Sequence, residues 1–471
     1  MRTLHWFRSD LRLQDNPALT LACQQGAVLP VFIIDTDEPP ESAVGAASRA
    51  WLDRSLHALN ASLGGGLLVD KGRASELLPM LCQRYQIDAV TWNRCYEPYA
   101  IARDTQLKQT LKSLGCVVSS CSGSLLYEPW VAVKKDGTAY RVFTPFYKHC
   151  QANLTRRSTT ALDPAGQDWI TPESATDIEA LGLRPSPEWD QRLLEYWVPG
   201  EAGAEARLSE FLASGLTDYR VGRDYPAERS VSRLSPHLHH GEISPHQILK
   251  RLQAFPTDDN HEHFVRELVW REFAYHLLYH FPELPHRNLQ SKFDHFPWTD
   301  DAERLAAWQQ GRTGYPIVDA GMRELWQTGS MHNRVRMIVA SFLVKNLRLH
   351  WQHGLRWFWD CLVDADLASN SASWQWCAGS GADAAPYFRI FNPITQGQRF
   401  DPKGEYTKRF LPELAAMPSK YLFEPWNAPA AVLREAGVIL GENYPQPIVD
   451  VKASREAALE AFAEMKRRAA L

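Results

Sequence analysis

The chain changes its hydrophobic periodicity once, and this change restricts the fold more than any other feature of the sequence. Residues 1–125 alternate segments of helical period with short apolar runs, which are typical of buried parallel strands. The runs are LHWF, VLPVFII, GLLVD and AVTWN. From residue 201 onward, strand patterns give way to successive helical segments. The sequence therefore predicts an α/β fold class, with a doubly wound, Rossmann-like parallel sheet followed by an all-helical domain.

Composition gives these predicted parts their boundaries. Residues 1–125 form the α/β domain and residues 201–471 form the helical domain. Between them, residues 126–200 lose their periodicity and gain Pro, Ser, Thr and Asp, which is typical of a long connector on the surface. At 471 residues the chain is long enough for two hydrophobic cores.

Composition and motifs argue against several classes of protein. The hydrophobic content of 45% excludes wholesale disorder, and the net charge of −4 gives no global signal for nucleic acid, so any basic surface has to be local. The eight cysteines include no CxxC pair, so we expect reduced thiols rather than a disulfide framework or a zinc site. Neither GxSxG nor Walker A occurs, which leaves hydrolase and NTPase functions unsupported.

The sequence also predicts where the protein works. No apolar run approaches the roughly 18 residues of a membrane span. The first residues, MRTLHWFRSDLR, are charged where a signal peptide has its apolar core. We therefore expect a cytoplasmic protein that makes no membrane contact, and we separately expect it to be a monomer.

Charged and amide side chains crowd the residues that follow the first predicted strand. They are Arg8, Asp10, Arg12, Asp15 and Asn16. Open α/β sheets bind ligands at the carboxyl ends of their strands, so these side chains are candidates for a ligand site. Internal ion pairs explain the same charges equally well, and the sequence leaves both interpretations open.

A second concentration of polar and aromatic side chains lies between residues 364 and 393. Asp364, Asp366 and Asn370 precede the run Trp-Gln-Trp, and a stretch of small residues, 378–385, follows. A plain core does not interleave carboxylates with large aromatic rings, and an exposed helix rarely carries so many of them. We expect this stretch to form the wall of a buried pocket for a large, flat ligand with polar edges.

Two predicted helices carry polar groups on otherwise apolar faces. In the helix over 331–350, Asn333 and Met337 share one face and Arg336 needs a partner. Asp364 or Asp366 could neutralise Arg336 and so link this helix to the predicted pocket. The alternative is that the ion pair has a purely structural role. In the helix over 262–281, Glu267 and Trp270 lie one turn apart, which suggests a pocket.

A loop that begins at Tyr219 is rich in arginine and hydroxyl side chains. Its segment 232–235, Ser-Arg-Leu-Ser, precedes a predicted helix and could bind a phosphate through backbone N–H groups and hydroxyls. The histidines at 237, 239 and 240 have no spaced acid or cysteine to complete a metal site, so we expect them to be solvated or capping.

Long motifs in a fixed order identify a family. They are WFRSDLRLQDN, SRLSP, VRELVWREF, GYPIVDAGMREL, MHNRVRMIVASFLVK, LVDADLASNSASWQW, DAAPYFRIFNP and NYPQPIVD. Through them nearly the whole chain resembles the DNA photolyase/cryptochrome family, and within it the bacterial cyclobutane-pyrimidine-dimer photolyases. The resemblance implies that the α/β domain holds an antenna chromophore and that the helical domain binds FAD.

The resemblance also implies which residues bind the flavin. Asn370 would face the flavin N5, and position 231 is Val where many relatives have a Thr that contacts phosphate. The implied FAD-binding residues are Tyr219, Val231, Ser232, Arg233, Leu234, Ser235, Arg336, Asp364, Asp366 and Asn370.

The implied reaction is light-dependent repair of cyclobutane pyrimidine dimers in UV-damaged DNA, by electron transfer from excited reduced FAD to the flipped-out dimer. The implied catalytic residues are Glu267, Asn333, Met337 and Asn370. Substrate-binding roles fall to aromatic rings that stack on the lesion and to arginines that contact flanking phosphates, namely Trp270, Trp376, Arg223 and Arg334.

Three tryptophans match the positions of the family's electron-transfer chain. From the flavin outward they are Trp374, Trp351 and Trp298. The last rests on the least constrained of the matches.

The same motifs favour one branch of the family. Asn333 and Met337 stand where (6-4) photolyases carry a catalytic histidine pair, so that chemistry lacks its proton donor. Asn370 stands where plant cryptochromes have Asp, and the chain ends at Leu471 without a long signalling tail. A cryptochrome-type blue-light photoreceptor without repair activity is the alternative. For the antenna we expect 5,10-methenyltetrahydrofolate, with 8-hydroxy-5-deazaflavin as the alternative.

Overall fold

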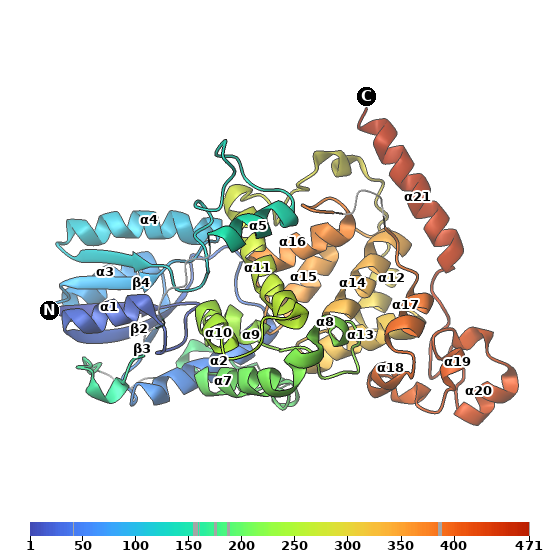
Figure 1. Cartoon of the computed structure of the whole chain (residues 1–471), viewed down its shortest axis with the longest axis horizontal. Coiled ribbons are helices and arrows are strands. Elements are labelled where there is room, and N and C mark those ends of the chain that lie inside the picture. The colour runs from blue at the N-terminus through green and yellow to red at the C-terminus, as the bar shows by residue number, and fades with distance from the viewer. Residues whose placement is uncertain are drawn as a thin grey trace. The chain divides into compact units, whose positions relative to one another are not determined.

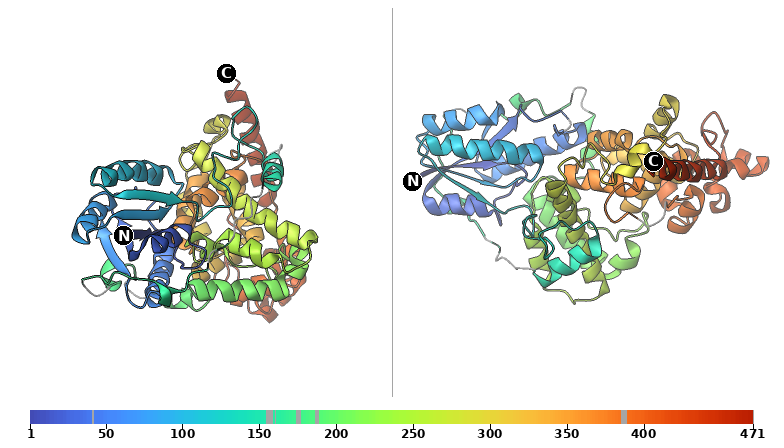
Figure 2. Two further views of the ribbon diagram at one scale, coloured as in Figure 1. Left: turned by 60° about the vertical axis from the view of Figure 1, so that its left-hand side comes forward. Right: turned by 90° about the horizontal axis from the view of Figure 1, so that it is seen from above.

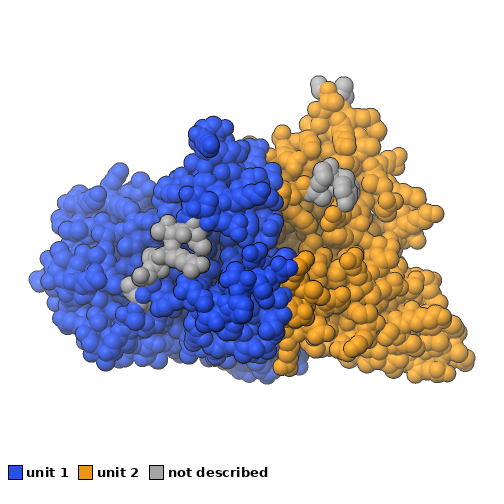
Figure 3. Space-filling view, in the orientation of Figure 1, with its two compact units in different colours: residues 1–217, 232–282, 363–368 blue, residues 218–231, 283–362, 369–471 orange. Residues whose placement is uncertain are grey.

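The computed structural model describes residues 1–470 with the exception of 41, 154–158, 160, 174–176, 186–188 and 385–388, and of the side chain at 194. The described chain forms two compact units (Figure 3). Unit 1 comprises residues 1–217, 232–282 and 363–368, and unit 2 comprises 218–231, 283–362 and 369–471. The domain boundaries expected at residues 125 and 200 stay a prediction.

Unit 1 contains a five-stranded parallel sheet with the order β3-β2-β1-β4-β5 (Figure 1). The four predicted strands are all present, and a fifth, which the sequence analysis missed, forms one edge. Its sequence VVSSC is short and largely half-buried, so it lacks the apolar run that marks the others. The strands are β1 (Arg2–Phe7), β2 (Ala27–Asp35), β3 (Leu68–Gly72), β4 (Ala89–Asn93) and β5 (Val117–Cys121).

Helices cover both faces of this sheet, which confirms the doubly wound prediction. One hydrophobic cluster joins Leu19 and Leu56, from the first two helices, to Phe7 and Phe32 of the sheet. The other joins the next two helices to the opposite face, where Trp6 projects. The four helices are α1 (Pro17–Gln25), α2 (Ala46–Ser62), α3 (Ala74–Arg84) and α4 (Pro98–Ser113).

The polar side chains after β1 are paired with protein groups. The guanidinium of Arg12 is fully buried and donates to the backbone carbonyls of Asp15, Gly123 and Gly241 at 2.6–3.3 Å. Arg8 forms a 2.6 Å ion pair with Asp104. The backbone N–H of Arg8 and the side-chain amide of Asn93 both donate to the Asp10 carboxylate, and Asn16 caps α1. Of the two interpretations that the sequence left open, the structure supports internal pairing.

The expected connector contains short helices, and further helices complete unit 1. The segment VFTPFYKHC lies largely in α5 (Phe143–Ala152), which packs on α11. A π-helical turn, Phe211–Gly215, extends α7. The other elements are η1 (Pro164–Gly166), η2 (Glu179–Leu181), α6 (Asp190–Leu194), α7 (Glu201–Glu210), η4 (Leu216–Asp218), α9 (Ser235–His239), α10 (Pro245–Leu252) and α11 (Asp259–His280).

The histidine cluster near α9 corrects a prediction. His237 and His240 are buried, not solvated. His237 hydrogen-bonds the Glu242 carboxylate, and His240 Nε2 lies 3.0 Å from the carbonyl of Val363. Sequence alone could not show this, because the partners are supplied by a turn and by a segment more than a hundred residues away. No group of His, Cys, Asp and Glu in the described part of the chain could hold a metal ion.

Unit 2 is helical, as predicted, and Figure 2 shows its long C-terminal helix, α21, from two sides. Its elements are α8 (Tyr219–Gly222), η5 (Ser291–His295), α12 (Ala302–Gln309), α13 (Pro316–Thr328), α14 (Asn333–Ser341), η6 (Phe342–Asn346), α15 (Trp351–Cys361), α17 (Pro393–Phe400), α18 (Glu405–Phe410), η7 (Pro412–Leu414), α19 (Ser419–Leu422), η8 (Pro425–Asn427), α20 (Ala430–Ala436) and α21 (Val451–Arg468).

One of these helices differs from the expectation. The helix expected over 331–350 is α14 followed by a π-helical turn, η6, after which a separate helix begins. The predicted pocket wall, residues 364–393, contains α16 (Leu367–Ala378). The first two residues of this helix belong to unit 1, and the remainder belongs to unit 2. Among the described helices, none combines the length and apolarity that crossing a membrane requires.

Candidate functional site

Asp366 is the best-defined part of the candidate site in unit 1. Its buried carboxylate accepts a hydrogen bond from the Tyr275 hydroxyl and lies 3.8 Å from Nδ1 of His239. Burial by itself would raise the pKa of Asp366, but the nearby His239 with its charge, the charge of Arg271 and the hydrogen bond from Tyr275 together outweigh burial and lower that pKa below its ordinary value. Asp366 is therefore an ionised acceptor at neutral pH, which suits it to receive N–H or O–H donors.

Burial also shifts the pKa values of two side chains on α11, Tyr275 and Glu272. Burial, reinforced by the charge of Asp366, raises the pKa of Tyr275 well above its ordinary value, so its hydroxyl remains a donor. Burial also raises the pKa of Glu272 to about 7. The Glu272 carboxylate accepts the backbone N–H groups of Leu126 and Tyr127 at 2.9 and 3.1 Å. Glu272 thus fixes the start of the expected connector on α11.

Glu267 and Trp270, the predicted lesion contacts of α11, are both half-buried. The Trp270 indole stacks on Phe143, with centroids 3.6 Å apart and planes 5° apart. One face of this indole is therefore covered by the protein, and a ligand would have to stack on the opposite face.

The predicted phosphate loop has a constrained backbone. Arg233 adopts φ 53°, in the left-handed region that a non-glycine residue enters only at a cost of about 1–3 kcal/mol. The Leu234 N–H donates weakly to the Ser232 hydroxyl at 3.4 Å, and the buried Leu234 side chain anchors the loop. Ser235, the first residue of α9, is exposed. The loop is shaped by its surroundings rather than by local preference.

In unit 2, α14 carries three of the predicted DNA contacts, Asn333, Arg334 and Met337. Asn333 is exposed, and Met337 one turn later is half-buried. Arg334 pairs with Asp224 at 2.6 Å, and its guanidinium lies 4.3 Å from the centroid of the Phe400 ring. The arginine therefore combines a fixed position with partial exposure, as a phosphate contact requires.

Arg336, on the same helix, donates from Nε to the Met331 carbonyl at 2.7 Å. Its two predicted partners, Asp364 and Asp366, are buried residues of unit 1. That pairing stays a prediction.

Asn370 is buried on α16, and only one side of its amide has a described partner. Its Nδ2 donates to the Leu355 carbonyl at 3.1 Å. This bond fixes the orientation of the amide, so that Oδ1 is the group that can accept a hydrogen bond from a ligand.

The three consecutive residues of the Trp-Gln-Trp run lie in different environments. Trp374 is buried and meets the Phe358 ring edge-on, with centroids 5.0 Å apart. Gln375 is fully buried and donates to the carbonyls of Leu284 and Arg287 at 2.6 and 2.8 Å. Trp376 is half-buried. Gln375 is therefore structural, which the sequence analysis did not predict.

The two outer tryptophans of the predicted electron-transfer chain share one neighbour. Trp351 is fully buried, donates to Asn288 at 3.0 Å and stacks on His350 with a centroid distance of 5.5 Å. Trp298 meets the same His350 ring edge-on at 5.0 Å. An aromatic path thus joins Trp351 to the half-buried Trp298 within unit 2.

The remaining predicted residues lie at the edges of the loop from 219 to 231. Tyr219 is buried, and the guanidinium of Arg223 lies 5.4 Å from the centroid of its ring. Val231 is half-buried. Residues 385–388 of the motif DAAPYFRIFNP lie outside the described residues.

Sequence reasoning missed the two side chains that neighbour the Asp366 carboxylate, Tyr275 and His239. Tyr275 lies eight residues after Glu267, two helical turns along the same helix, and this spacing could have indicated it. His239 was expected to be solvated or capping, after a metal site had been discounted. A search for hydrogen-bond partners of buried carboxylates would have included it.

Comparisons with known proteins agree with this picture. A family profile described as "DNA photolyase" matches residues 3–165, and one described as "FAD binding domain of DNA photolyase" matches residues 264–464. The chain is 47% identical to a deoxyribodipyrimidine photo-lyase of Agrobacterium fabrum, over 98% of both chains. It is 39% identical to Cryptochrome-2 of Arabidopsis thaliana, over 99% of this chain and 79% of that protein.

A solved structure agrees closely. The crystal structure of a bacterial class III photolyase from Agrobacterium tumefaciens superposes with a TM-score of 0.94, at 46% identity over 99% of this chain and 98% of the other. These matches span the α/β sheet and the helices alike, and the chain belongs to the DNA photolyase/cryptochrome family.

Proposed function

We propose that the protein repairs cyclobutane pyrimidine dimers in DNA under blue light, with FAD as its cofactor. The observation that carries the proposal is the 47% identity, over nearly the full length, to a relative named deoxyribodipyrimidine photo-lyase. Asn370 supports it, since this amide stands where the resemblance gives plant cryptochromes a carboxylate.

The residues of the site fit a flavin. Bound reduced FAD would supply the photochemical electron transfer. Asn370, with its Nδ2 bound to Leu355, offers a carbonyl acceptor, and Asp366 offers an ionised one. The hydroxyls and backbone N–H groups of residues 232–235 would receive the pyrophosphate, with Tyr219, Val231, Arg336 and Asp364 as further contacts.

Other residues would receive the DNA. Glu267 would accept or donate a hydrogen bond at the base carbonyls, and Asn333 and Met337 would line the lesion pocket beside it. The indoles of Trp270 and Trp376 would stack on the flipped dimer. The arginines Arg223 and Arg334 would contact phosphates, so DNA binding should weaken with salt.

A blue-light photoreceptor without repair activity is the second candidate, because cryptochromes also match nearly the whole chain. The deciding measurement uses chemically reduced, flavin-loaded protein and an oligonucleotide that contains one thymine dimer. Loss of the dimer under blue light, and not in the dark, supports repair. Intact dimers after prolonged illumination would leave the photoreceptor as the better account.

A variant series assigns the roles. Glu267→Ala should lower the repair yield about tenfold or more, as expected when a hydrogen bond to the reacting bases is lost, while flavin content stays normal. Glu262→Ala removes an exposed carboxylate from the first turn of the same helix and should leave repair unchanged. Loss of flavin from the Glu267 variant would instead make that residue structural.

Trp374→Phe tests the electron-transfer chain of Trp374, Trp351 and Trp298. Photoreduction of oxidised flavin should slow, while repair by chemically reduced protein continues. Trp308→Phe is a matched control, because Trp308 touches Trp374 but is not a member of the proposed chain. Equal photoreduction in both variants would refute the chain as drawn.

The antenna is proposed to be 5,10-methenyltetrahydrofolate, with 8-hydroxy-5-deazaflavin as the alternative. Absorption spectra of purified protein, together with the mass of the released chromophore, distinguish the two.

A further inference from the structure

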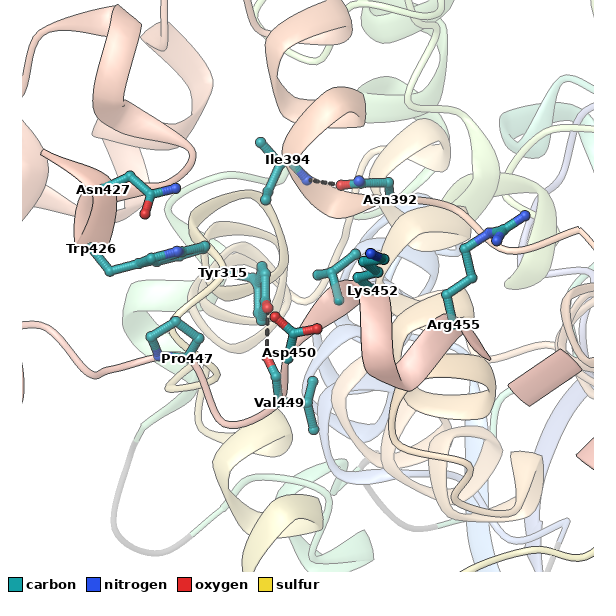
Figure 4. A pocket seen from close by; sticks show the side chains of 11 residues that line it. Tyr315, Asn392, Ile394, Trp426, Asn427, Pro447, Val449, Asp450, Lys452 and Arg455 are labelled. Atoms are coloured by element: carbon teal, nitrogen blue, oxygen red, sulfur yellow. Dashed lines mark hydrogen bonds between the residues drawn. The ribbon is translucent and has the colours of Figure 1, made fainter. Parts of the chain in front are cut away.

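Unit 2 contains a pocket of about 600 Å³ to which the repair reaction assigns no role. Its walls come from four segments: Tyr315 before α13, residues 392–394 at the start of α17, residues 426–427 in η8, and residues 447–455 at the start of α21 (Figure 4). The volume lies within the range of about 300–1,000 Å³ that small-molecule sites occupy.

One end of the pocket is aromatic. The rings of Tyr315 and Trp426 meet at 72° with centroids 5.2 Å apart, and the Tyr315 hydroxyl donates to the Val449 carbonyl at 2.6 Å. This bond fixes the Tyr315 ring, and Pro447 lies beside Trp426 (Figure 4). The Trp426 indole is only half-buried, so a flat ring can stack against it.

The other end of the pocket is cationic. Lys452 and Arg455 lie on the first turns of α21, on the opposite side of Tyr315 from Trp426 (Figure 4). Both side chains are exposed, and neither forms an ion pair with any residue that the structure describes. The 18-residue helix α21 begins here and adds the positive potential of its N-terminus.

Polar groups between the two ends have donors or acceptors that can still form hydrogen bonds. Asp450 caps α21 by accepting the Ala453 N–H on one carboxylate oxygen at 2.7 Å, which leaves the second oxygen as an acceptor. Asn392 accepts the Ile394 N–H through Oδ1 at 2.9 Å, which directs its Nδ2 donors elsewhere. The pocket therefore combines an aromatic face, an acceptor in the middle and a net positive end.

We infer that this pocket binds a nucleotide. The base would stack on Trp426, the sugar hydroxyls would donate to Asp450, and the phosphate would bind Lys452 and Arg455. A purely apolar ligand would leave the two cations unused, and a simple anion would leave the aromatic end unused. The same chemistry belongs to a free mononucleotide and to the phosphorylated end of a nucleic acid strand.

Calorimetry on the full-length, flavin-loaded protein in the dark tests the inference, because bound FAD keeps the probes out of its own site. The probes are AMP, adenosine, inorganic phosphate and a trinucleotide of thymidine with a 5′-phosphate. We expect AMP to bind at least tenfold more tightly than adenosine or phosphate. The double variant Lys452→Ala/Arg455→Ala should lower AMP affinity at least tenfold, to the level of adenosine.

Two matched variants separate this site from general effects. Lys466→Ala/Arg467→Ala removes two exposed charges from the far end of the same helix and should leave AMP affinity unchanged. Trp426→Ala should weaken AMP binding, and Trp426→Phe, which keeps a flat ring, should restore most of it. Circular dichroism and flavin content confirm that each variant is folded.

The outcomes decide the inference and the source of the ligand. AMP binding without binding of the trinucleotide identifies a free nucleotide, and tighter binding of the trinucleotide identifies a strand end; either supports the inference. It is overturned if neither probe binds at millimolar concentration, if adenosine matches AMP, or if the Lys452/Arg455 variant binds AMP like the unchanged protein.

Discussion

The polar cluster after β1 and the polar stretch from Asp364 to Asn370 look alike in the sequence but differ in how their hydrogen bonds are satisfied. After β1, the Arg12 guanidinium donates hydrogen bonds to three backbone carbonyls, and Arg8 forms an ion pair with Asp104. In the second stretch, Asn370 donates from Nδ2 to the Leu355 carbonyl and offers Oδ1 as an acceptor, and the neighbours of Asp366 keep its carboxylate ionised.

The difference shows that a high density of charged side chains does not by itself mark a ligand site. Buried polar groups have to be paired, and a cluster that pairs within the protein stabilises the fold. A cluster whose acceptors remain oriented but only partly used is suited to a ligand. Substitutions in the two clusters should therefore affect different properties, stability in the first and ligand binding in the second.

The largest effect is expected for Arg12→Ala. This change leaves the carbonyls of Asp15, Gly123 and Gly241 buried without their donor, so it should destabilise the protein by about 3–5 kcal/mol or prevent folding. Thermal unfolding and soluble yield measure it.

Arg73→Ala is the control for this prediction. Arg73 pairs with Asp37 on the surface of the same unit, so its loss should change Tm little. A normal Tm for the Arg12 variant would mean that the cluster after β1 is not a structural one.

Tyr275→Phe should have the next largest effect, and it acts on the second cluster. The change removes the hydroxyl that donates to the buried Asp366 carboxylate, and a hydrogen bond to a charged group contributes about 1.5–3 kcal/mol. We expect a lower Tm together with weaker retention of flavin. Tyr279→Phe, one turn later on α11, removes a hydroxyl from a half-buried residue and serves as the control. Equal flavin retention in both variants would contradict a ligand-binding role for Asp366.

The sequence predicted the fold better than it predicted which side chains contact one another within the site. Four strands and the helical character of unit 2 follow from local periodicity, whereas the edge strand β5 escaped because VVSSC carries too few apolar residues. The residue pattern indicated the pocket-forming stretch with Asp364, Asp366 and Asn370, and the resemblance implied which ligands these residues bind. The neighbours of the Asp366 carboxylate, His239 and Tyr275, are brought to it by tertiary packing across about 90 residues or more, which periodicity cannot encode.

The turn after α14 gives a similar lesson. The residues Phe342–Asn346 match an α-helical pattern, and nothing in their order indicates a π-helical turn. Within that turn Lys345 is buried and donates to the Ala378 carbonyl at the end of α16. A lysine in an apolar helix pattern gives no indication that it caps another helix.

Lys345→Met should stabilise the protein. Burial lowers the pKa of Lys345 from 10.5 to about 7, so the unfolded chain binds more protons than the folded one between these values. Stability of the unchanged protein therefore rises with pH from about 7 to 10.5. The variant should gain roughly 1–2 kcal/mol near pH 7, after loss of the hydrogen bond to Ala378 is deducted.

The pH dependence makes this prediction specific. The Tm advantage of the Lys345 variant should be largest at or below pH 7 and should shrink as the pH approaches 10. Lys292→Met, near Phe293 in the same unit, has no comparable burial and should show no such trend. A constant Tm difference across the range would show that burial of the ammonium group is not its cause.

The smallest effect on stability is expected for Arg334→Ala, and it separates DNA binding from folding. Arg334 pairs with Asp224 at 2.6 Å, and partly exposed pairs contribute about 0–1 kcal/mol. If Arg334 contacts a phosphate, its removal should weaken binding to all DNA sequences alike and reduce the slope of log affinity against log salt by about one. Arg323→Ala breaks the comparable pair with Glu413, 2.7 Å long and similarly buried, and should leave the slope unchanged. Because both variants lose one ion pair and one positive charge, a difference in slope can come only from where that charge lies, and equal slopes would remove Arg334 from the DNA-binding surface.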